Sequence, residues 1–308
     1  MGFECLYWIP YLSHLLSQAR IDPSRLVIVT RGGAAAWYGP SCRAVELFDY
    51  LPVAEVRRAL LAAFTATGSM KQTGVTPFER DFLALTATRL GITRYHVLHP
   101  SEMYRDLQPW WSLHMSVHDL MQRVTFRPLA VPQVPLAIAL PEGPFIAVKF
   151  YSRPTWPATE ALRDFAQDLV IKLAKKAPVV LLDAGFHADD HAGVPIGLSD
   201  RVMSLAGQMT PQNNLAVQSA VLSKARAFVG TYGGTMQLAV RLGKPSVGLH
   251  LHFTGTAFGH KVLTDWLALK QQTPIFIGTP QQADLVRAVV SVALELPQSA
   301  GSSSGVLA

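Results

Sequence analysis

Short runs rich in Val, Ile and Leu alternate with amphipathic stretches along most of this chain. Such alternation is typical of βα units, in which helices connect the parallel strands of a sheet and cover its faces. The predicted strands are residues 26–30, 44–48, 95–98, 145–151, 179–183, 202–205, 227–229, 246–249 and 275–277. The predicted helices are residues 3–19, 53–67, 77–90, 157–175, 211–224, 235–242, 258–269 and 280–296, with a broken helical stretch over 102–123. The sequence therefore predicts an α/β fold.

Three threonines mark predicted helix starts. Thr76 precedes a proline and is followed three positions later by Glu79, which is the arrangement of a capping box. Thr210 and Thr279 also precede a proline, as an N-cap residue does before a first-turn proline.

A proline-rich stretch divides the chain. Residues 126–143 read FRPLAVPQVPLAIALPEG and show no helical period. We therefore predict an N-terminal domain at 1–127, a linker at 128–144, a C-terminal domain at 145–296 and a Ser/Gly-rich tail at 297–308. The 308 residues suit two α/β domains better than one.

The opening of the first domain is unusual for this class. A Rossmann domain normally begins with a strand, whereas here the first predicted helix starts at residue 3. We expect either that another segment fills the place of that strand or that the natural chain starts further upstream.

Composition, charge and missing motifs disfavour several classes of partner and enzyme. The net charge is +6, but Lys and Arg form no run and no basic-aromatic module, so nucleic acid is a disfavoured partner. Dispersed positive charge fits an anionic small molecule or a loose association with an anionic membrane surface. No Gly-x-Gly-x-x-Gly with an acidic residue about 20 positions later and no P-loop is present, which argues against a dehydrogenase or an ATPase.

The cellular location follows from similar observations. Cys5 and Cys42 form no Cys-x-x-Cys pair, so a reducing compartment is expected. No apolar run reaches the roughly 18 residues of a membrane helix, and the first 20 residues lack a basic signal-peptide region. We expect a cytoplasmic protein, with peripheral contact at the inner face of the membrane left open.

The strongest candidate site is a glycine turn between a predicted strand and a predicted helix. Its residues are Thr231, Tyr232, Gly233, Gly234 and Thr235. Glycines let a backbone approach a ligand closely, and the first N–H groups of the helix favour a phosphate. A plain tight turn capped by Thr235 is the alternative.

Basic residues follow two further predicted strands. Lys149 and Arg153 lie at the carboxyl end of the strand 145–151, where open α/β sheets bind ligands and where cations can neutralise a diphosphate. Arg31 follows the strand 26–30 and could bind an anionic acceptor. Solvated charges at a strand end are the alternative for Lys149 and Arg153, and a tight turn with one exposed arginine is the alternative for Arg31.

The segment AFVGTYGGTMQLAVRLGKPSVGLH resembles the donor-domain signature of bacterial GT-B glycosyltransferases, the heptosyltransferases among them. TPQNNLAVQSAVLSKA resembles the element ahead of that loop in several polysaccharide glycosyltransferases, and the likeness covers residues 145–265. It implies two Rossmann-like domains facing a cleft, with the diphosphate of a sugar nucleotide held by the glycine turn. It also supports Lys149, because these enzymes have a basic residue in a similar place.

The N-terminal GFECLYWIP resembles a GFELLYWLP-type opening of some bacterial glycosyltransferase-like proteins, where it follows the first strand. Inverting enzymes of this kind place a carboxylate base at the start of that helix, which implies this role for Glu4. A glutamate that simply complements the helix dipole is the alternative.

The histidines give weaker signals. His260, at a predicted helix start, could hydrogen-bond a nucleotide or sugar hydroxyl, although a structural role is the favoured explanation for a lone histidine. His187 and His191 flank two aspartates in a segment that an ordinary surface loop also explains, so we predict no metal site.

These observations together predict a glycosyltransferase that moves a sugar from a nucleoside-diphosphate donor to a glycan or lipid-linked acceptor. Inversion without a metal or cofactor is the expected chemistry. A sugar-nucleotide epimerase or hydrolase on the same fold, and a non-catalytic sugar-nucleotide-binding protein, remain alternatives.

Overall fold

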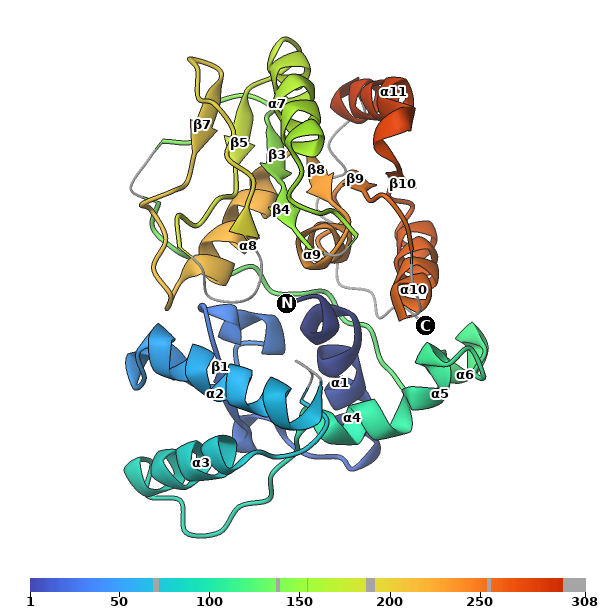
Figure 1. Cartoon of the computed structure of the whole chain (residues 1–308). Coiled ribbons are helices and arrows are strands. Elements are labelled where there is room, and N and C mark those ends of the chain that lie inside the picture. Colours follow the sequence, from blue (N-terminus) through green and yellow to red (C-terminus); the bar gives the residue numbers. More distant parts are fainter. Residues whose placement is uncertain (69–71, 137–138, 154, 187–191, 254–255, 296–308) are drawn as a thin grey trace.

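The computed structural model describes residues 1–68, 72–136, 139–153, 155–186, 192–253 and 256–295, which form an α/β fold (Figure 1). The N-terminal elements are η1 (Glu4–Trp8, a π-helical turn), α1 (Ile9–Gln18), η2 (Pro23–Arg25), β1 (Val27–Thr30), η3 (Ala34–Tyr38), β2 (Arg43–Glu46), η4 (Leu47–Asp49), α2 (Val53–Thr67), α3 (Pro77–Arg89), α4 (Pro100–Asp106), α5 (Gln108–Trp111) and α6 (Val117–Met121). The C-terminal elements are β3 (Ile146–Lys149), β4 (Tyr151–Ser152), α7 (Glu160–Ala174), β5 (Val179–Leu181), β6 (Ala192–Gly193), β7 (Val202–Ser204), α8 (Asn214–Lys224), β8 (Ala227–Thr231), α9 (Gly234–Arg241), β9 (Ser246–Leu249), α10 (Thr256–Lys270), β10 (Ile275–Gly278), η5 (Pro280–Gln282) and α11 (Ala283–Glu295).

The C-terminal part is built on a six-stranded sheet in which every neighbouring pair is parallel. The strands follow the order β7-β5-β3-β8-β9-β10. The chain therefore winds outward from β3 to one edge and then from β8 to the other, which is the doubly wound Rossmann-like arrangement. Its topological switch point lies between β3 and β8.

Helices cover both faces of this sheet, as a parallel sheet requires. Ile146 and Val148 of β3 pack in one hydrophobic cluster with residues of α7 and α11. Ala147, between them, belongs to a second cluster with residues of α8, α9 and α10. The period-two alternation of a strand thus distributes neighbouring side chains to opposite faces.

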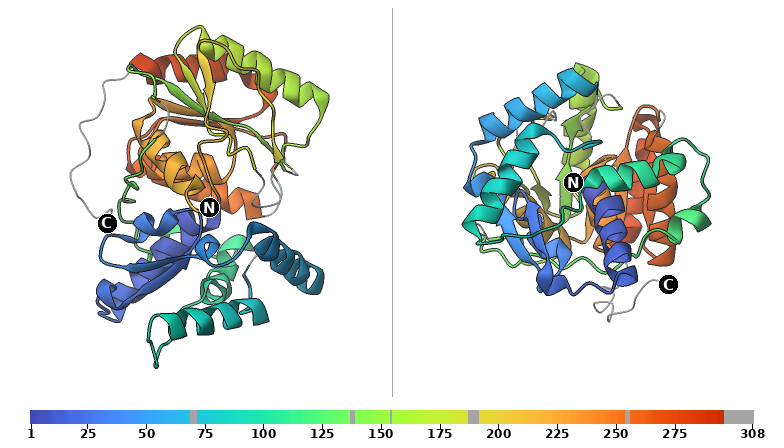
Figure 2. Two further views of the ribbon diagram at one scale, coloured as in Figure 1. Left: turned by 90° about the vertical axis from the view of Figure 1, so that its left-hand side faces the viewer. Right: turned by 90° about the horizontal axis from the view of Figure 1, so that it is seen from below.

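The described residues of the N-terminal part contain one parallel pair, β1 with β2, and this part lies against the sheet's α8–α10 side (Figure 2). The second cluster continues into it: Tyr7 and Trp37 belong to the same buried cluster as Met236. The Gly32 carbonyl accepts hydrogen bonds from Leu215 N (2.8 Å) and Ala216 N (2.9 Å) at the start of α8. The two parts are thus packed on one continuous core.

Two features differ from the sequence-based expectation. Residues 95–98 form no strand, and none of the described strands pairs with their backbone. The expected strand 145–151 divides into β3 and β4, and β4 pairs antiparallel with β6 instead of joining the main sheet.

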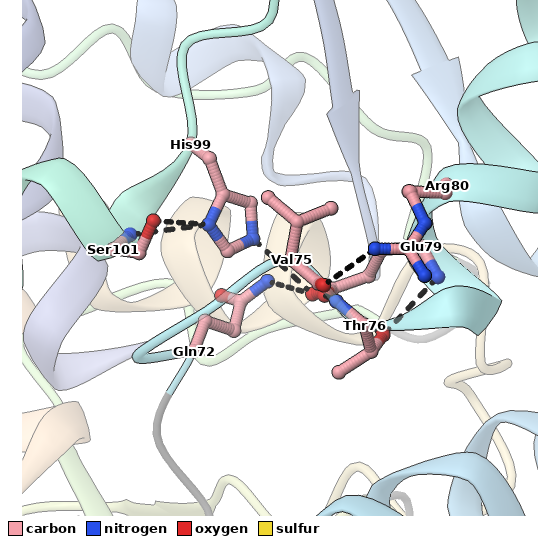
Figure 3. Close-up of polar contacts among 7 residues, drawn as sticks. All are labelled: Gln72, Val75, Thr76, Glu79, Arg80, His99 and Ser101. Carbon is pink, nitrogen blue, oxygen red and sulfur yellow. Dashed lines mark hydrogen bonds and ion pairs between the residues drawn. The ribbon is translucent and has the colours of Figure 1, made fainter.

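Two predicted helix starts are confirmed and one is wrong. Thr76 Oγ1 accepts from Glu79 N (3.2 Å) while Glu79 Oε2 accepts from Thr76 N (2.7 Å), which completes the capping box (Figure 3). Thr279 forms a second capping box with Gln282. After Thr210 the chain first makes a turn, in which Asn213 Oδ1 accepts from Thr210 N (2.7 Å), and α8 begins only at Asn214.

The predicted linker carries no helix or strand among its described residues. Arg127, the residue just before it, is tied to the C-terminal part by Arg241, whose Nη2 donates to the Arg127 carbonyl at 2.8 Å. The predicted tail 297–308 lies outside the described residues. No described helix combines the length and the apolar character needed to cross a bilayer.

Candidate functional site

A cavity of about 2010 Å³ lies between the N-terminal part and the carboxyl edge of the six-stranded sheet. Ligands of open α/β sheets bind outside the carboxyl ends of the strands, at the switch point. Lys149 ends β3 and Gly233 follows β8, and both line the cavity. The other predicted site residues that line it are Glu4, Arg31, Arg153, Tyr232, Gly234, Thr235 and His260. The structure thus brings nine of the ten predicted residues to one place.

Thr231 is the residue that does not line the cavity. It is fully buried, and its hydroxyl hydrogen-bonds to Tyr151 N (3.1 Å) and to the Tyr151 carbonyl (3.2 Å). This side chain ties the end of β8 to β4. Its observed role is therefore to hold the two strand ends that carry the neighbouring site residues.

The glycine turn brings the start of α9 to the cavity. A methyl group on Gly233 would overlap the Tyr151 hydroxyl and the Arg153 guanidinium, so both side-chain ends would have to move to admit it. The helix begins at Gly234 with no side-chain cap. Because first-turn N–H groups have no acceptor within a helix, this end of α9 offers donors and a partial positive charge.

Two cations stand beside that turn. Lys149 Nζ donates to Gln218 Oε1 at 2.6 Å, which orients the ammonium along the α8 side of the cavity. Arg153 Nη1 donates to the Tyr232 carbonyl at 3.2 Å, while its buried Nε has no hydrogen-bond partner among the described residues. The cavity wall at the switch point is therefore positively charged and fixed in geometry.

The N-terminal part contributes a carboxylate to the same cavity. Glu4 opens η1, and its Oε1 accepts a hydrogen bond of 2.9 Å from the Tyr38 hydroxyl. Burial and the neighbouring Glu4 charge raise the pKa of Tyr38 well above its usual value. Tyr38 therefore stays protonated and holds the carboxylate in one orientation.

Arg31 lines the cavity at the end of β1, and the two glycines after it have φ values of 70° and 74°. Glu46 accepts from Gly32 N (3.0 Å) and Gly33 N (2.9 Å), so this turn is clamped to β2. Burial raises the pKa of Glu46, although the backbone donors act in the opposite direction. The turn therefore fixes the end of β1 against β2 and also places the Arg31 cation at the rim of the cavity.

His260 joins the site to an aromatic cluster. Its Nδ1 lies 2.8 Å from the Tyr7 hydroxyl, which also accepts from Trp110 Nε1 at 3.1 Å. Phe3 packs edge-on against the imidazole, with ring centroids 4.7 Å apart. His260 is thus a packed side chain that reaches the cavity from α10.

A polar network occupies the part of the cavity wall formed by α3 and the start of α4 (Figure 3). His99 lies between Ser101 Oγ, 2.9 Å from its Nδ1, and Glu79 Oε1, 3.4 Å from its Nε2. Gln72 Nε2 donates to the same Glu79 oxygen at 2.8 Å. Burial raises the pKa of Glu79, but the hydrogen bonds outweigh it and lower that pKa to about 2.

Sequence reasoning missed Tyr38, Gln218 and Tyr151. Tyr38 contacts a residue 34 positions away and Gln218 one 69 positions away, so no local motif indicates either contact. One signal was present for Gln218, because a polar residue in the middle of an apolar helix is buried only with a partner. Gln218 is 1% exposed.

No cluster of three or more metal-ligating side chains occurs within the described part of the chain. The histidine-flanked loop 187–191 lies outside the described residues.

Chemically, the cavity combines a cationic wall and a helix N-terminus at the switch point with an oriented carboxylate from the N-terminal part. The cationic wall and the helix N-terminus suit a phosphate or diphosphate, and the carboxylate suits proton abstraction. Known proteins add no assignment, since no family model and no curated protein matches the sequence.

Proposed function

We propose that this protein is a glycosyltransferase of the GT-B kind, which transfers a sugar from a nucleoside-diphosphate donor to a glycan or lipid-linked acceptor. The observation that supports it is the cavity shared by Lys149, Arg153, the start of α9 and, from the opposite part, Glu4. An enzyme that closes around two substrates needs its donor and acceptor groups on facing walls. The resemblance of residues 145–265 to such donor domains agrees with this assignment.

The proposed reaction is a single displacement with inversion. The Glu4 carboxylate takes the proton of an acceptor hydroxyl, whose oxygen forms the new bond to the anomeric carbon. The bond from that carbon to the diphosphate oxygen breaks, and its electron pair leaves with the nucleoside diphosphate. Tyr38, through its hydrogen bond to Glu4 Oε1, keeps the carboxylate aimed at the acceptor.

Negative charge grows on the leaving diphosphate during this step. Lys149, Arg153 and the first N–H groups of α9 stabilise it more strongly in the transition state than in the ground state. These groups already supply two positive charges and a helix end, so we propose that no metal ion takes part. The reaction takes place in the cytoplasm, where sugar nucleotides are available, with an anionic membrane surface as a place for lipid-linked acceptors.

Donor binding is tested by the thermal unfolding of the protein with UDP, GDP, ADP or CMP, with and without EDTA. One nucleoside diphosphate should raise the melting temperature, and EDTA should leave the rise unchanged; a ligand at 100 times its Kd stabilises by about 2.7 kcal/mol. Lys149→Met should abolish the rise, whereas Lys172→Met, on the outer surface of α7, should not.

Catalysis is tested with sugar nucleotides that carry the same base as the nucleoside diphosphate that raises the melting temperature. Glu4→Gln should lower turnover by about 100-fold or more, the usual contribution of a general base, while donor stabilisation persists. An unchanged turnover in Glu4→Gln would remove the proposed base. Stabilisation without any transfer in the parent protein would favour the non-catalytic binding alternative, and no stabilisation by any nucleotide would reject the donor site.

A further inference from the structure

The turn that carries the proposed base packs against both parts of the molecule. Glu4 is the first residue of η1, a π-helical turn that runs directly into α1. Turns of this kind are rare and occur frequently at functional sites. Besides α1 and α4, η1 contacts α9 and α10 of the C-terminal part, and the N-terminus lies close to α9 in Figure 1. Contacts with the C-terminal part can therefore set the orientation of Glu4.

The segment that leads into η1 meets the start of α9 backbone to backbone. A methyl group on Gly234 would lie 2.9 Å from Gly2 N and 3.4 Å from Met1 Cβ. A methyl group on Gly2 would overlap Gln237 Oε1. The two glycines thus let the chains touch, which ties the position of η1 to that of the first turn of α9.

A chain of hydrogen bonds holds the other end of the turn. Trp110 Nε1, from α5, donates to the Tyr7 hydroxyl at 3.1 Å, and this hydroxyl lies 2.8 Å from His260 Nδ1 of α10. Because an indole N–H only donates, the proton of the tyrosine is left for His260 Nδ1 to accept. Burial raises the pKa of Tyr7 above its usual value, so the hydroxyl keeps that proton. Tyr7 is fully buried, where a polar group that loses its partner costs stability.

The turn is therefore held at two points. Glu4 is fixed from the N-terminal part by the Tyr38 hydroxyl. Tyr7, three residues later in the same turn, is fixed by His260 of the C-terminal part. These two anchors keep the turn from rotating about its axis, so the carboxylate keeps one direction relative to the start of α9.

We infer that Tyr7 and His260 are positioning residues for the general base, with His260 acting through Tyr7. The inference rests on the proposed function, in which Glu4 takes the proton of the acceptor. Misplacing a catalytic group by about 1 Å can cost about 100-fold in rate. Release of the turn should therefore lower turnover without weakening donor binding.

The first arm of the test compares Tyr7→Phe with Tyr11→Phe. Each removes one hydrogen-bonded hydroxyl from the continuous helix of η1 and α1, but Tyr11 donates to Asp106 Oδ2 (2.6 Å) inside the N-terminal part. The probe is the slow transfer of the sugar to water, measured as nucleoside diphosphate released from UDP-glucose, GDP-mannose or ADP-glucose. Tyr7→Phe should lower kcat about tenfold, the rate equivalent of one hydrogen bond, and leave KM unchanged. Tyr11→Phe should change neither.

Two further comparisons separate positioning from a purely structural role. In a Glu4→Gln background, Tyr7→Phe should lower the rate by no more than about twofold further, because the group that it positions is already gone. His260→Asn keeps an acceptor close to the place of Nδ1 and should restore most of the rate that His260→Leu loses.

The second arm needs no turnover. In protein labelled with carbon-13 at the glutamate carboxyl carbons, the signal of Glu4 is assigned by its loss in Glu4→Gln. Tyr7→Phe should shift this signal, because the carboxylate moves relative to the Tyr38 hydroxyl. Tyr11→Phe should leave it in place.

An unshifted Glu4 signal in Tyr7→Phe would overturn the inference, whatever the turnover shows. Equal losses of kcat in Tyr7→Phe and Tyr11→Phe, or a full further loss in the Glu4→Gln background, would also overturn it. A shifted signal in a protein that turns over none of the sugar nucleotides would support the positioning of Glu4 and count against the proposed glycosyl transfer alone.

Discussion

At the scale of single residues, Glu79 illustrates how one side chain serves both a helix and the cavity wall. It completes the capping box of α3 with Thr76, and it also accepts from Gln72 and lies beside His99. Burial alone raises the pKa of this carboxyl, and the combined donors bring it from 4.5 down to about 2. The ionised carboxylate of Glu79 therefore stabilises the folded state relative to the protonated form.

This preference predicts a dependence of stability on pH. The stabilisation from Glu79 should be fully present above about pH 4.5, the unfolded-state pKa, and should be lost as the pH falls towards about 2. Glu79→Gln keeps a residue that can cap the helix but removes the titration. Urea unfolding at a series of pH values should show the parent protein with the higher free energy of unfolding near neutral pH. The difference from this variant should shrink as the solution becomes acidic. Glu55→Gln, an exposed position in the first turn of α2, is the control and should show no such convergence.

At the scale of elements, the start of α9 depends on the missing side chain of Gly233. Gly233→Ala should displace Tyr151 and Arg153, since the added methyl overlaps both. We expect a loss of about 1–3 kcal/mol in stability, as for other overpacked sites, and at least tenfold weaker nucleotide binding. Thermal unfolding and a nucleotide titration measure the two effects.

Gly143→Ala is the matched control, because a methyl group there meets no atom within 4 Å. It should leave both quantities nearly unchanged. Equal effects of the two substitutions would mean that the close packing at Gly233 is unimportant.

The same scale shows what could be predicted from the sequence. Local signals sufficed for the Thr76 capping box and for the strand-turn-helix at Gly233, because each depends on neighbouring residues. They failed for residues 95–98, since a strand needs a partner that only the tertiary arrangement supplies. Within the site, the strand-end rule placed Lys149 correctly at the cavity, whereas the Tyr38 contact with Glu4 depends on how η3 returns to η1.

At the scale of the whole molecule, the cavity exists because the two parts are held together through buried contacts. Trp37 of η3 donates to Ser219 Oγ of α8 at 3.1 Å, and both residues are buried. Ser219 Oγ in turn donates to the Leu215 carbonyl at 2.6 Å. The continuous hydrophobic cluster across this interface further predicts that the two parts unfold together.

We therefore predict that Trp37 and Ser219 are energetically coupled across the interface. Trp37→Phe and Ser219→Ala should each destabilise by about 1–3 kcal/mol, the range for a buried hydrogen bond that loses one partner. The double variant should cost less than the sum, since either change alone already breaks the bond. Ser223→Ala is the control, because that hydroxyl donates only within α8, to the Ala220 carbonyl. Strict additivity would show that Trp37 and Ser219 are not coupled. Two separate unfolding transitions in the parent protein would show that the two parts fold independently, so that the cavity between them can open without disrupting either core.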